Sequence, residues 1–292
     1  MRNKELIANV PSISCVENYF LGWCMEQGIG AEILYNRTYL PAGEILADFI
    51  YSDTRFENYD KIERIMAVAE GYGVTGHLMA VGLNLENIDS AIRGGRLALV
   101  EVNEHFFENI ARKPWRDDHY IWLTEKTDKG YLYLNNYPLS AGEISVKELT
   151  GIYNGRTLVY DKKDGIAPVF VRDDAERQIW KIIYTDHMDF TLPEDVDLTA
   201  LRDAMGILKI TRRRLADWFK AAGTMGRLTK REQTNSLIRF LRDYCAELNG
   251  FYVRLEAAIL RKKSDLDKAR EAVSNIIDRE RELSRLVKES VV

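Results

Sequence analysis

Apolar residues in the first part of the chain recur at the three- and four-residue spacing of amphipathic helices. Residues 12–28 begin after Pro11, and their apolar positions predict a helix that ends at Gly28. Residues 57–71 and 87–94 have the same spacing and predict two further helices. We therefore expect the chain to begin with helices.

From about residue 96 the pattern changes to short apolar runs between polar turns, which is typical of β-strands. The runs 119–126 and 130–135 flank a polar turn and predict a β-hairpin. Further strands are predicted at 96–103, 156–160, 168–171 and 179–184. Because the helices come first and the strands follow, the pattern indicates an α+β fold.

After Pro193 the strand pattern stops and long helical segments follow. We predict helices at 197–221, with an interruption near Ile210, at 230–248 and at about 251–289. The sequence therefore divides into a first domain at 1–193 and an all-helical domain at 194–292.

The last predicted helix carries an apolar stripe, which consists of Tyr252, Leu255, Ile259, Leu266, Ala269, Val273, Ile276, Leu283 and Val287. Lys262 and Glu280 fall on the same stripe and interrupt it. Such a stripe packs either on its own domain, which we favour, or on a second copy of the chain in a coiled coil. A homodimer through this helix is therefore the alternative expectation.

Composition and cysteine usage narrow the class of protein. Of the 292 residues, 46% are hydrophobic and 29% are charged, a balance typical of globular proteins. The chain has no apolar run long enough to span a membrane and no signal-peptide pattern at its start. Its three cysteines, Cys15, Cys24 and Cys245, do not form a disulfide framework. We therefore expect a reduced, cytoplasmic protein with no membrane partner.

Charge is distributed unevenly along the chain. Residues 201–292 contain 21 Lys and Arg against 13 Asp and Glu, whereas residues 1–200 contain 20 against 32. The two parts therefore carry net charges of +8 and −12, within a total of −4. Two explanations fit this difference in charge equally well. The two parts face different partners, or their solvated helix faces simply differ in composition.

Cys15 lies just inside the start of the first predicted helix. The N–H groups and the dipole of a helix favour an anion at this place. A thiol here therefore has a lowered pKa and a larger fraction of reactive thiolate. The alternative is a small buried residue that only fills space.

His119 opens the first strand of the predicted hairpin. A histidine there can take a proton from a nucleophile and return it to a leaving group. Asn135 and Asn136 close the partner strand, so the hairpin brings them close to His119. An Asn side chain can hold the imidazole in one orientation, as the third member of a triad does. The alternatives are a core or surface histidine and an ordinary turn.

The segment around Cys15, the run 100–138 and the helical C-terminal region together resemble the butirosin biosynthesis protein H family of papain-like acyltransferases. More distantly, they are similar to the bacteriocin-processing cysteine peptidases of ABC transporters. In both groups a helix-borne Cys precedes a strand-borne His, and an Asp follows about sixteen residues later. Cys15, His119 and Asn135 match these positions, with Asn in place of Asp, as in papain-like enzymes proper.

The resemblance implies a papain-like core, in which helices pack on an antiparallel sheet, followed by the all-helical region. It implies that Cys15 attacks the thioester of an acyl carrier protein or of CoA, and that His119 then activates an amine acceptor in natural-product or antibiotic biosynthesis. The oxyanion position of the peptidases, six residues before the Cys, is Asn9, and the Cys15 backbone N–H is the second donor. No cofactor is expected apart from the phosphopantetheine or CoA that carries the acyl group.

Two other functions would use the same residues. A cysteine hydrolase, either a peptidase or a thioesterase, transfers the acyl group to water, and a papain-like binding module performs no chemistry. His105 lies near the expected mouth of the site and is a candidate substrate contact, whereas His77 is expected to be structural.

Neither a metal site nor a nucleic-acid partner is expected. No spacing of Cys, His and Asp, including His187 between its two aspartates, predicts a metal site. Residues 208–225, with three consecutive arginines, look like a recognition helix that binds DNA, but an amphipathic helix explains the same pattern.

Overall fold

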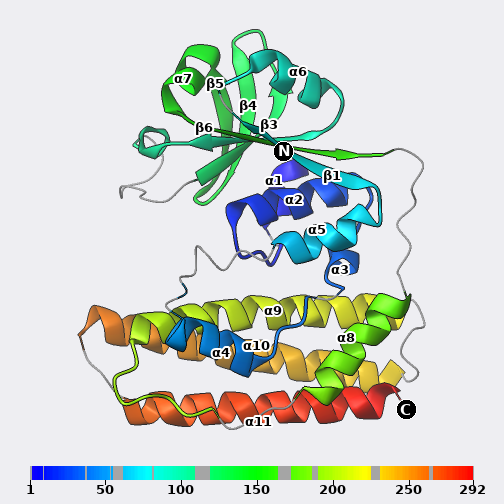
Figure 1. Cartoon of the computed structure of the whole chain (residues 1–292), viewed down its shortest axis with the longest axis vertical. Coiled ribbons are helices and arrows are strands. Elements are labelled where there is room, and N and C mark those ends of the chain that lie inside the picture. Colours follow the sequence, from blue (N-terminus) through cyan, green and yellow to red (C-terminus); the bar gives the residue numbers. More distant parts are fainter. Residues whose placement is uncertain are drawn as a thin grey trace. The chain divides into compact units, whose positions relative to one another are not determined.

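The computed structural model describes residues 2–8, 10–36, 38–52, 54, 62–80, 82–108, 119–163, 172–185, 190–224, 231–262 and 266–291. Its internal contacts divide the chain into two compact units (Figure 1). The first unit consists of Met1–Ala31 and Met66–Val169, and the second consists of Glu32–Ile65 and Phe170–Val292. The strands of the described residues all lie in the first unit, and the second is helical. The predicted α+β class is confirmed.

The elements of the first unit are, in chain order, α1 (Arg2–Ala8), α2 (Cys15–Glu26), β1 (Val74–Ala80), α6 (Leu85–Arg93), β2 (Leu97–Val102), the 3-10 turn η2 (Glu104–Phe106), β3 (His119–Lys126), β4 (Gly130–Asn136), β5 (Leu139–Ser145), α7 (Val146–Ile152) and β6 (Tyr153–Lys162). Two further helices, α3 (Ala31–Leu34) and α5 (Ile62–Glu70), cross the boundaries between the units. The six strands form one antiparallel sheet in the order β1-β6-β2-β3-β4-β5.

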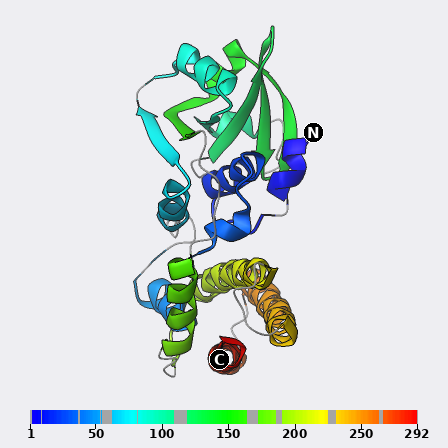
Figure 2. The ribbon, with the colours of Figure 1, turned by 90° about the vertical axis from the view of Figure 1, so that its right-hand side faces the viewer.

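Side chains alternate between the two faces of this sheet, and different helices cover each face. On one face, which we call the α2 face, Phe20 of α2 packs against Tyr160, and Tyr19 packs against Trp122. Figure 2 shows α2, in blue, against the sheet of the same unit. On the opposite face, α6 and α7 cover a core cluster of Ile88, Val100, Val102, Phe106, Phe107, Ile121, Leu123, Tyr131, Ile144 and Leu149.

Helix α2 begins at Cys15 because Ser14 caps it. The Ser14 side chain accepts a hydrogen bond from the Glu17 backbone N–H at 3.2 Å, which satisfies one of the N–H groups of the first turn. Farther along the helix, Trp23 donates from Nε1 to the carbonyl oxygen of Gly95 at 3.0 Å. The helix predicted around Cys15 is therefore confirmed and is anchored at both ends.

The second unit consists of α4 (Ala42–Tyr51), α8 (Arg172–Tyr184), α9 (Leu198–Thr224), α10 (Arg231–Leu260) and α11 (Leu266–Val291). Helix α9 packs on α10 and α4, and α11 packs on α10, α8 and α4. The stripe residues Ala269, Val273, Ile276, Leu283 and Val287 of α11 are buried within this unit. The homodimer stays a prediction. None of the helices in the described ranges is long and apolar enough to cross a membrane.

Two charged residues that interrupt the apolar patterns meet inside the helical unit. Arg212 and Glu280 are fully buried and form a two-point ion pair, with Nε 2.7 Å from Oε1 and Nη2 2.6 Å from Oε2. Nη2 also donates to the Leu40 carbonyl oxygen at 2.8 Å, and the Tyr39 hydroxyl donates to Glu280 at 3.2 Å. Neighbouring donors and acceptors thus compensate both buried charges, as burial of an ion pair requires.

The strand predicted at 179–184 is wrong, because these residues form the end of α8. Ala175, Ile179 and Ile182 are buried at helical spacing, so the helix places its apolar side chains in the core of the second unit. The strand predicted at 168–171 lies outside the described residues.

The two interruptions predicted in the long helices are also wrong. Helix α9 runs through Ile210 without a break, and α10 runs through residues 249–250 to end at Leu260. The single helix predicted at about 251–289 is also wrong, because its residues belong to two helices, α10, which ends at Leu260, and α11, which begins at Leu266. Lys262, just after α10, has a φ of 52°, which is not helical.

A single boundary at 193 does not coincide with the division by contacts. Helices α4 and α8 precede this position in the sequence but pack on α9 and α11, which follow it. The division into domains at 1–193 and 194–292 stays a prediction.

Candidate functional site

The hairpin brings His119 and Asn135 into direct contact. Nε2 of His119 lies 2.6 Å from Oδ1 of Asn135, and both side chains are buried. Nδ2 of Asn135 donates to the carbonyl oxygen of Pro138 at 2.9 Å, and this bond fixes which end of the amide faces the imidazole. Because Oδ1 can only accept, Nε2 carries the ring proton, and Nδ1 is the basic nitrogen of the neutral imidazole.

The surroundings of His119 keep the ring neutral. Its ring packs edge-to-face against Phe107, with 4.9 Å between the centroids. Burial lowers the pKa of His119 from 6.5 to about 4, and the hydrogen bond with Asn135 acts in the opposite direction. At neutral pH the ring can therefore accept a proton at Nδ1.

Tyr19 ties the start of α2 to the strand ends that carry His119 and Asn135. The hydroxyl oxygen of Tyr19 accepts a hydrogen bond from the Asn136 backbone N–H at 2.9 Å. The hydroxyl group donates its own proton either to the Tyr120 carbonyl oxygen, at 3.0 Å, or to Oδ1 of Asn136, at 3.2 Å. Sequence reasoning missed this residue. The only signal was a tyrosine on a buried helix face, where its hydroxyl needs a partner.

Cys15 lies one helical turn before Tyr19, on the same side of α2. It is half-buried and is the first residue of the helix, where the N–H groups favour an anion. Burial is the main cause that raises the pKa of Tyr19, and the charge of Cys15 adds to it. The same charge contributes to the raised pKa of Tyr120, the residue after His119. The hydrogen bonds of Tyr19, one turn later, place the start of α2 toward the end of the sheet where β3 begins.

The residues around Cys15 and His119 occupy different faces of the sheet. Tyr120 pairs with Glu101, and His119 pairs with Val102, so alternation puts Tyr120 on the α2 face and His119 on the opposite face. His119 is the first residue of β3, so its ring lies at the margin of the sheet.

The other predicted site residues have different surroundings. Asn136 contacts Tyr19 through Oδ1, so Asn135 is the amide that contacts the imidazole. His105 is exposed, and its Nδ1 lies 2.7 Å from Glu108, which raises the pKa of His105. Asn9 lies outside the described residues.

The remaining histidines and cysteines lie apart from the candidate site residues in the sequence. His77 lies on β1 and pairs in register with Val159, whereas His187 lies outside the described residues. Burial raises the pKa of Cys24, and it raises the pKa of Cys245 to about 11. Within the described ranges, no group of three or more His, Cys, Asp or Glu side chains could hold a metal ion.

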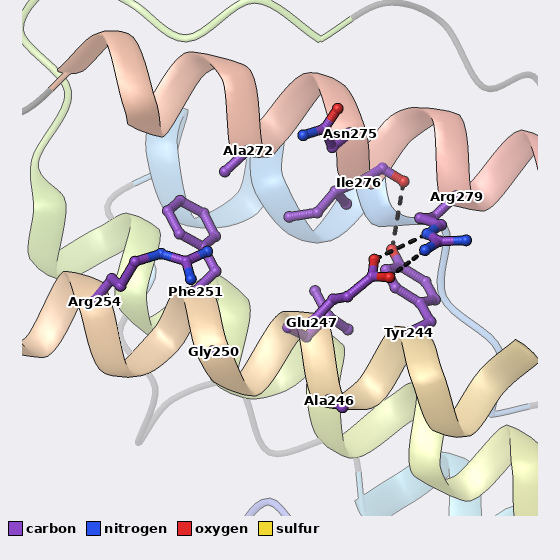
Figure 3. Close-up of a pocket in the computed structure, with 11 residues that line it drawn as sticks. Tyr244, Ala246, Glu247, Gly250, Phe251, Arg254, Ala272, Asn275, Ile276 and Arg279 are labelled. Carbon is purple, nitrogen blue, oxygen red and sulfur yellow. Dashed lines mark hydrogen bonds and ion pairs between the residues drawn. The ribbon is translucent and has the colours of Figure 1, made fainter.

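A pocket of about 470 Å³ lies between α10 and α11 in the helical unit (Figure 3). An ion pair between Glu247 and Arg279 closes one end, where Nε of Arg279 lies 2.9 Å from Oε2. At the other end the guanidinium of Arg254 lies 5.8 Å from the ring centroid of Phe251. The pocket contains no cysteine or histidine and none of the predicted site residues.

A scan against protein-family models finds no match for this chain, and a search of curated proteins finds no similar sequence.

Proposed function

We propose that the chain is a cysteine-dependent acyltransferase with a papain-like core. Cys15 is the nucleophile, His119 the general base and Asn135 the residue that orients the imidazole. The observation that carries this proposal is the contact between Nε2 of His119 and Oδ1 of Asn135, because it orients a neutral ring whose basic nitrogen is Nδ1.

The reaction would proceed in two transfers. In the first, Nδ1 of His119 takes the proton of the Cys15 thiol, and the sulfur attacks the carbonyl carbon of a thioester. A new C–S bond forms, the original C–S bond breaks, and the leaving thiolate takes the proton from the imidazolium. In the second, His119 deprotonates an amine that attacks the acyl-Cys15 carbonyl. A C–N bond then forms, and the sulfur leaves as the Cys15 thiol.

The start of α2 supplies the electrostatic support for this chemistry. The backbone N–H of Cys15 belongs to the first turn of α2, where the helix dipole favours an anion. It would donate to the oxyanion of the tetrahedral intermediate, with Asn9 as the second donor. The proposal requires the sulfur and Nδ1 to meet around the end of the sheet, beside the hydrogen bonds of Tyr19.

The donor and the acceptor follow from the resemblance to the butirosin biosynthesis protein H family. The donor would be an acyl carrier protein or CoA thioester, and the acceptor an amine of natural-product biosynthesis. The more acidic sequence of residues 1–200 suits a cationic acceptor, and the basic residues of 201–292 suit an acidic carrier protein.

The proposal is tested by intact mass after incubation of the full chain with acyl-CoA and with N-acetylcysteamine thioesters. We expect the mass of one acyl group to be added to the wild type and to Cys245→Ala, but not to Cys15→Ala. His119→Ala should slow the addition by about 10²- to 10⁴-fold.

The fate of the adduct separates the alternatives. Release that depends on an added amine, with formation of the amide, supports the acyltransferase. Equal release to the free acid without amine would make the protein a hydrolase. Absence of an adduct with every thioester would leave a binding module.

A further inference from the structure

Glu101, Tyr120 and Arg156 lie together on the α2 face of the sheet. Glu101 of β2 pairs directly with Tyr120 of β3. Leu99 of β2 pairs with Leu158 of β6, so these two residues share the α2 face. Arg156 lies two residues before Leu158 along β6, so alternation puts it on the same face, nearer to Glu101. Nη1 of Arg156 lies 3.7 Å from Oε1 of Glu101. The three side chains therefore form one charged cluster, contributed by three neighbouring strands.

This cluster lies beside Cys15. The Tyr19 hydroxyl lies 3.0 Å from the Tyr120 carbonyl oxygen, and Cys15 is one turn away on the same side of α2. Burial raises the pKa of Tyr120 to about 12, and the charges of Glu101 and Cys15 contribute to the increase. A hydrogen bond from the Arg156 side chain lowers the pKa of the same hydroxyl. Nucleophile, carboxylate and guanidinium thus all act on one phenol group.

The burial of the cluster is uneven. The side chain of Glu101 is 2% exposed, whereas that of Arg156 is 59% exposed. Glu101 is therefore the buried partner of a guanidinium that belongs to an exposed side chain. A guanidinium has five N–H donors in a fixed planar fork that matches a carboxylate or a phosphate.

We propose that Arg156 binds an anionic oxygen group of the thioester donor. The group is either a carboxylate on the acyl chain or a phosphate on the carrier arm. This inference rests on the proposed function, because it places the anion beside a nucleophile that accepts the acyl group. Arg156 is then a residue that determines donor specificity. The alternative role, in which it only compensates the charge of Glu101, predicts no preference among donors.

The test measures the rate of adduct formation at Cys15 with three donors. These are propionyl-N-acetylcysteamine, which is neutral, succinyl-N-acetylcysteamine, which has an acyl carboxylate, and propionyl-phosphopantetheine, which has a phosphate on the arm. We expect the wild type to prefer one charged donor over the neutral donor by about 10- to 100-fold, as a charge-assisted hydrogen bond allows. The charged donor that is preferred identifies the source of the anion.

Three variants separate binding from folding. Arg156→Gln should abolish the preference among the three donors. Arg156→Lys keeps the charge opposite Glu101 but lacks the fork, so it should fold normally and lose most of the preference. Arg93→Gln, at the exposed end of α6, is the matched control and should keep the preference.

A binding measurement distinguishes failure of this inference from failure of the proposed function. Calorimetric titration of the Cys15→Ser chain with the amide analogue of the charged donor needs no acyl transfer. If Arg156→Gln lowers the affinity for this analogue about tenfold or more, the result supports the anion site. This holds even if the wild type forms no adduct. Equal affinity of both chains, or equal slowing of all three donors in Arg156→Gln, would overturn the inference.

Discussion

His119 owes its proposed role to two neighbours that act in different ways. Asn135 fixes the tautomer through Nε2, and Phe107 contributes the apolar surroundings that disfavour the charged ring. With a pKa of about 4 the ring is neutral at pH 7 and can accept a proton at Nδ1. In the proposed reaction, we expect the imidazolium to form only as a proton moves from Cys15 to Nδ1.

The lowered pKa of His119 predicts how stability depends on pH. Between about pH 4 and 6.5 the unfolded chain binds a proton at this residue and the folded chain does not, so the free energy of unfolding rises with pH. The lowering corresponds to about 3 kcal/mol, lost as the pH falls from 6.5 to 4. Urea denaturation across this range, for the wild type and for His119→Gln, measures the difference.

His105 provides the control for this pH dependence. The neighbouring Glu108 raises the pKa of His105, so any stability that it contributes is present at low pH and lost as the pH rises. His105→Gln should therefore keep the loss of stability below pH 6.5. A loss of equal size in His119→Gln and in the wild type would contradict a neutral, buried His119.

Some residues of the candidate site could be predicted from the sequence because they belong to one hairpin. The spacing of His119 and Asn135 places them on adjacent strands whatever the rest of the fold. Tyr19 could not be assigned in this way, because its hydrogen bonds join positions more than a hundred residues apart. The same holds for Glu101 and Arg156, whose contact depends on the strand order β6-β2-β3.

At the scale of elements, the sequence predicts one local pairing, that of β3 with β4, and misses another, that of β4 with β5. The hairpin of β3 and β4 follows from two apolar runs around a polar turn. Strand β1 was missed, because its partner β6 is about eighty residues away and its sequence reads as a glycine-rich turn. Residues 179–184 were assigned to a strand because of their β-branched and aromatic residues, although burial follows the helical period.

Two glycines predict opposite effects of the same substitution. A Cβ at Gly130 of β4 would lie 2.0 Å from the Ile144 carbonyl oxygen, which belongs to the backbone of β5. Gly130→Ala should therefore lower the free energy of unfolding by about 3 kcal/mol or more. A Cβ at Gly250 of α10 would meet only Nη1 of Arg254, at 3.6 Å. Gly250→Ala should raise the stability by about 0.5–1 kcal/mol, because alanine loses less entropy in a helix.

Thermal and urea denaturation of both glycine variants check this pair. The two chains differ from the wild type by one methyl group each, so the sign of the change isolates the local geometry. Equal destabilisation by both substitutions would contradict either the close approach of β4 and β5 or the continuity of α10.

At the scale of the whole molecule, the helical unit depends on one buried ion pair that joins α9 to α11. Glu280→Gln would leave the charge of Arg212 buried without its carboxylate, and should cost about 3–5 kcal/mol. Replacing both residues together by Met and Leu should recover most of this loss. Chemical denaturation of the full chain, followed by far-ultraviolet circular dichroism, measures both effects.

An exposed ion pair on α11 provides the matched control. Arg285 and Glu289 are about half exposed and lie one helical turn apart, so Glu289→Gln should change the stability by less than about 0.5 kcal/mol. If Glu280→Gln has as small an effect, Arg212 and Glu280 are not paired inside the protein.

The relative reactivity of the three cysteines tests the central claim most directly. The full chain is treated with iodoacetamide at pH 7, and alkylation of Cys15, Cys24 and Cys245 is followed by peptide mass mapping. We expect Cys15 to react first and its rate to fall at least about tenfold in His119→Ala, while the rates of the two other cysteines stay unchanged. A Cys15 that reacts no faster than Cys245, at a rate independent of His119, would contradict the account.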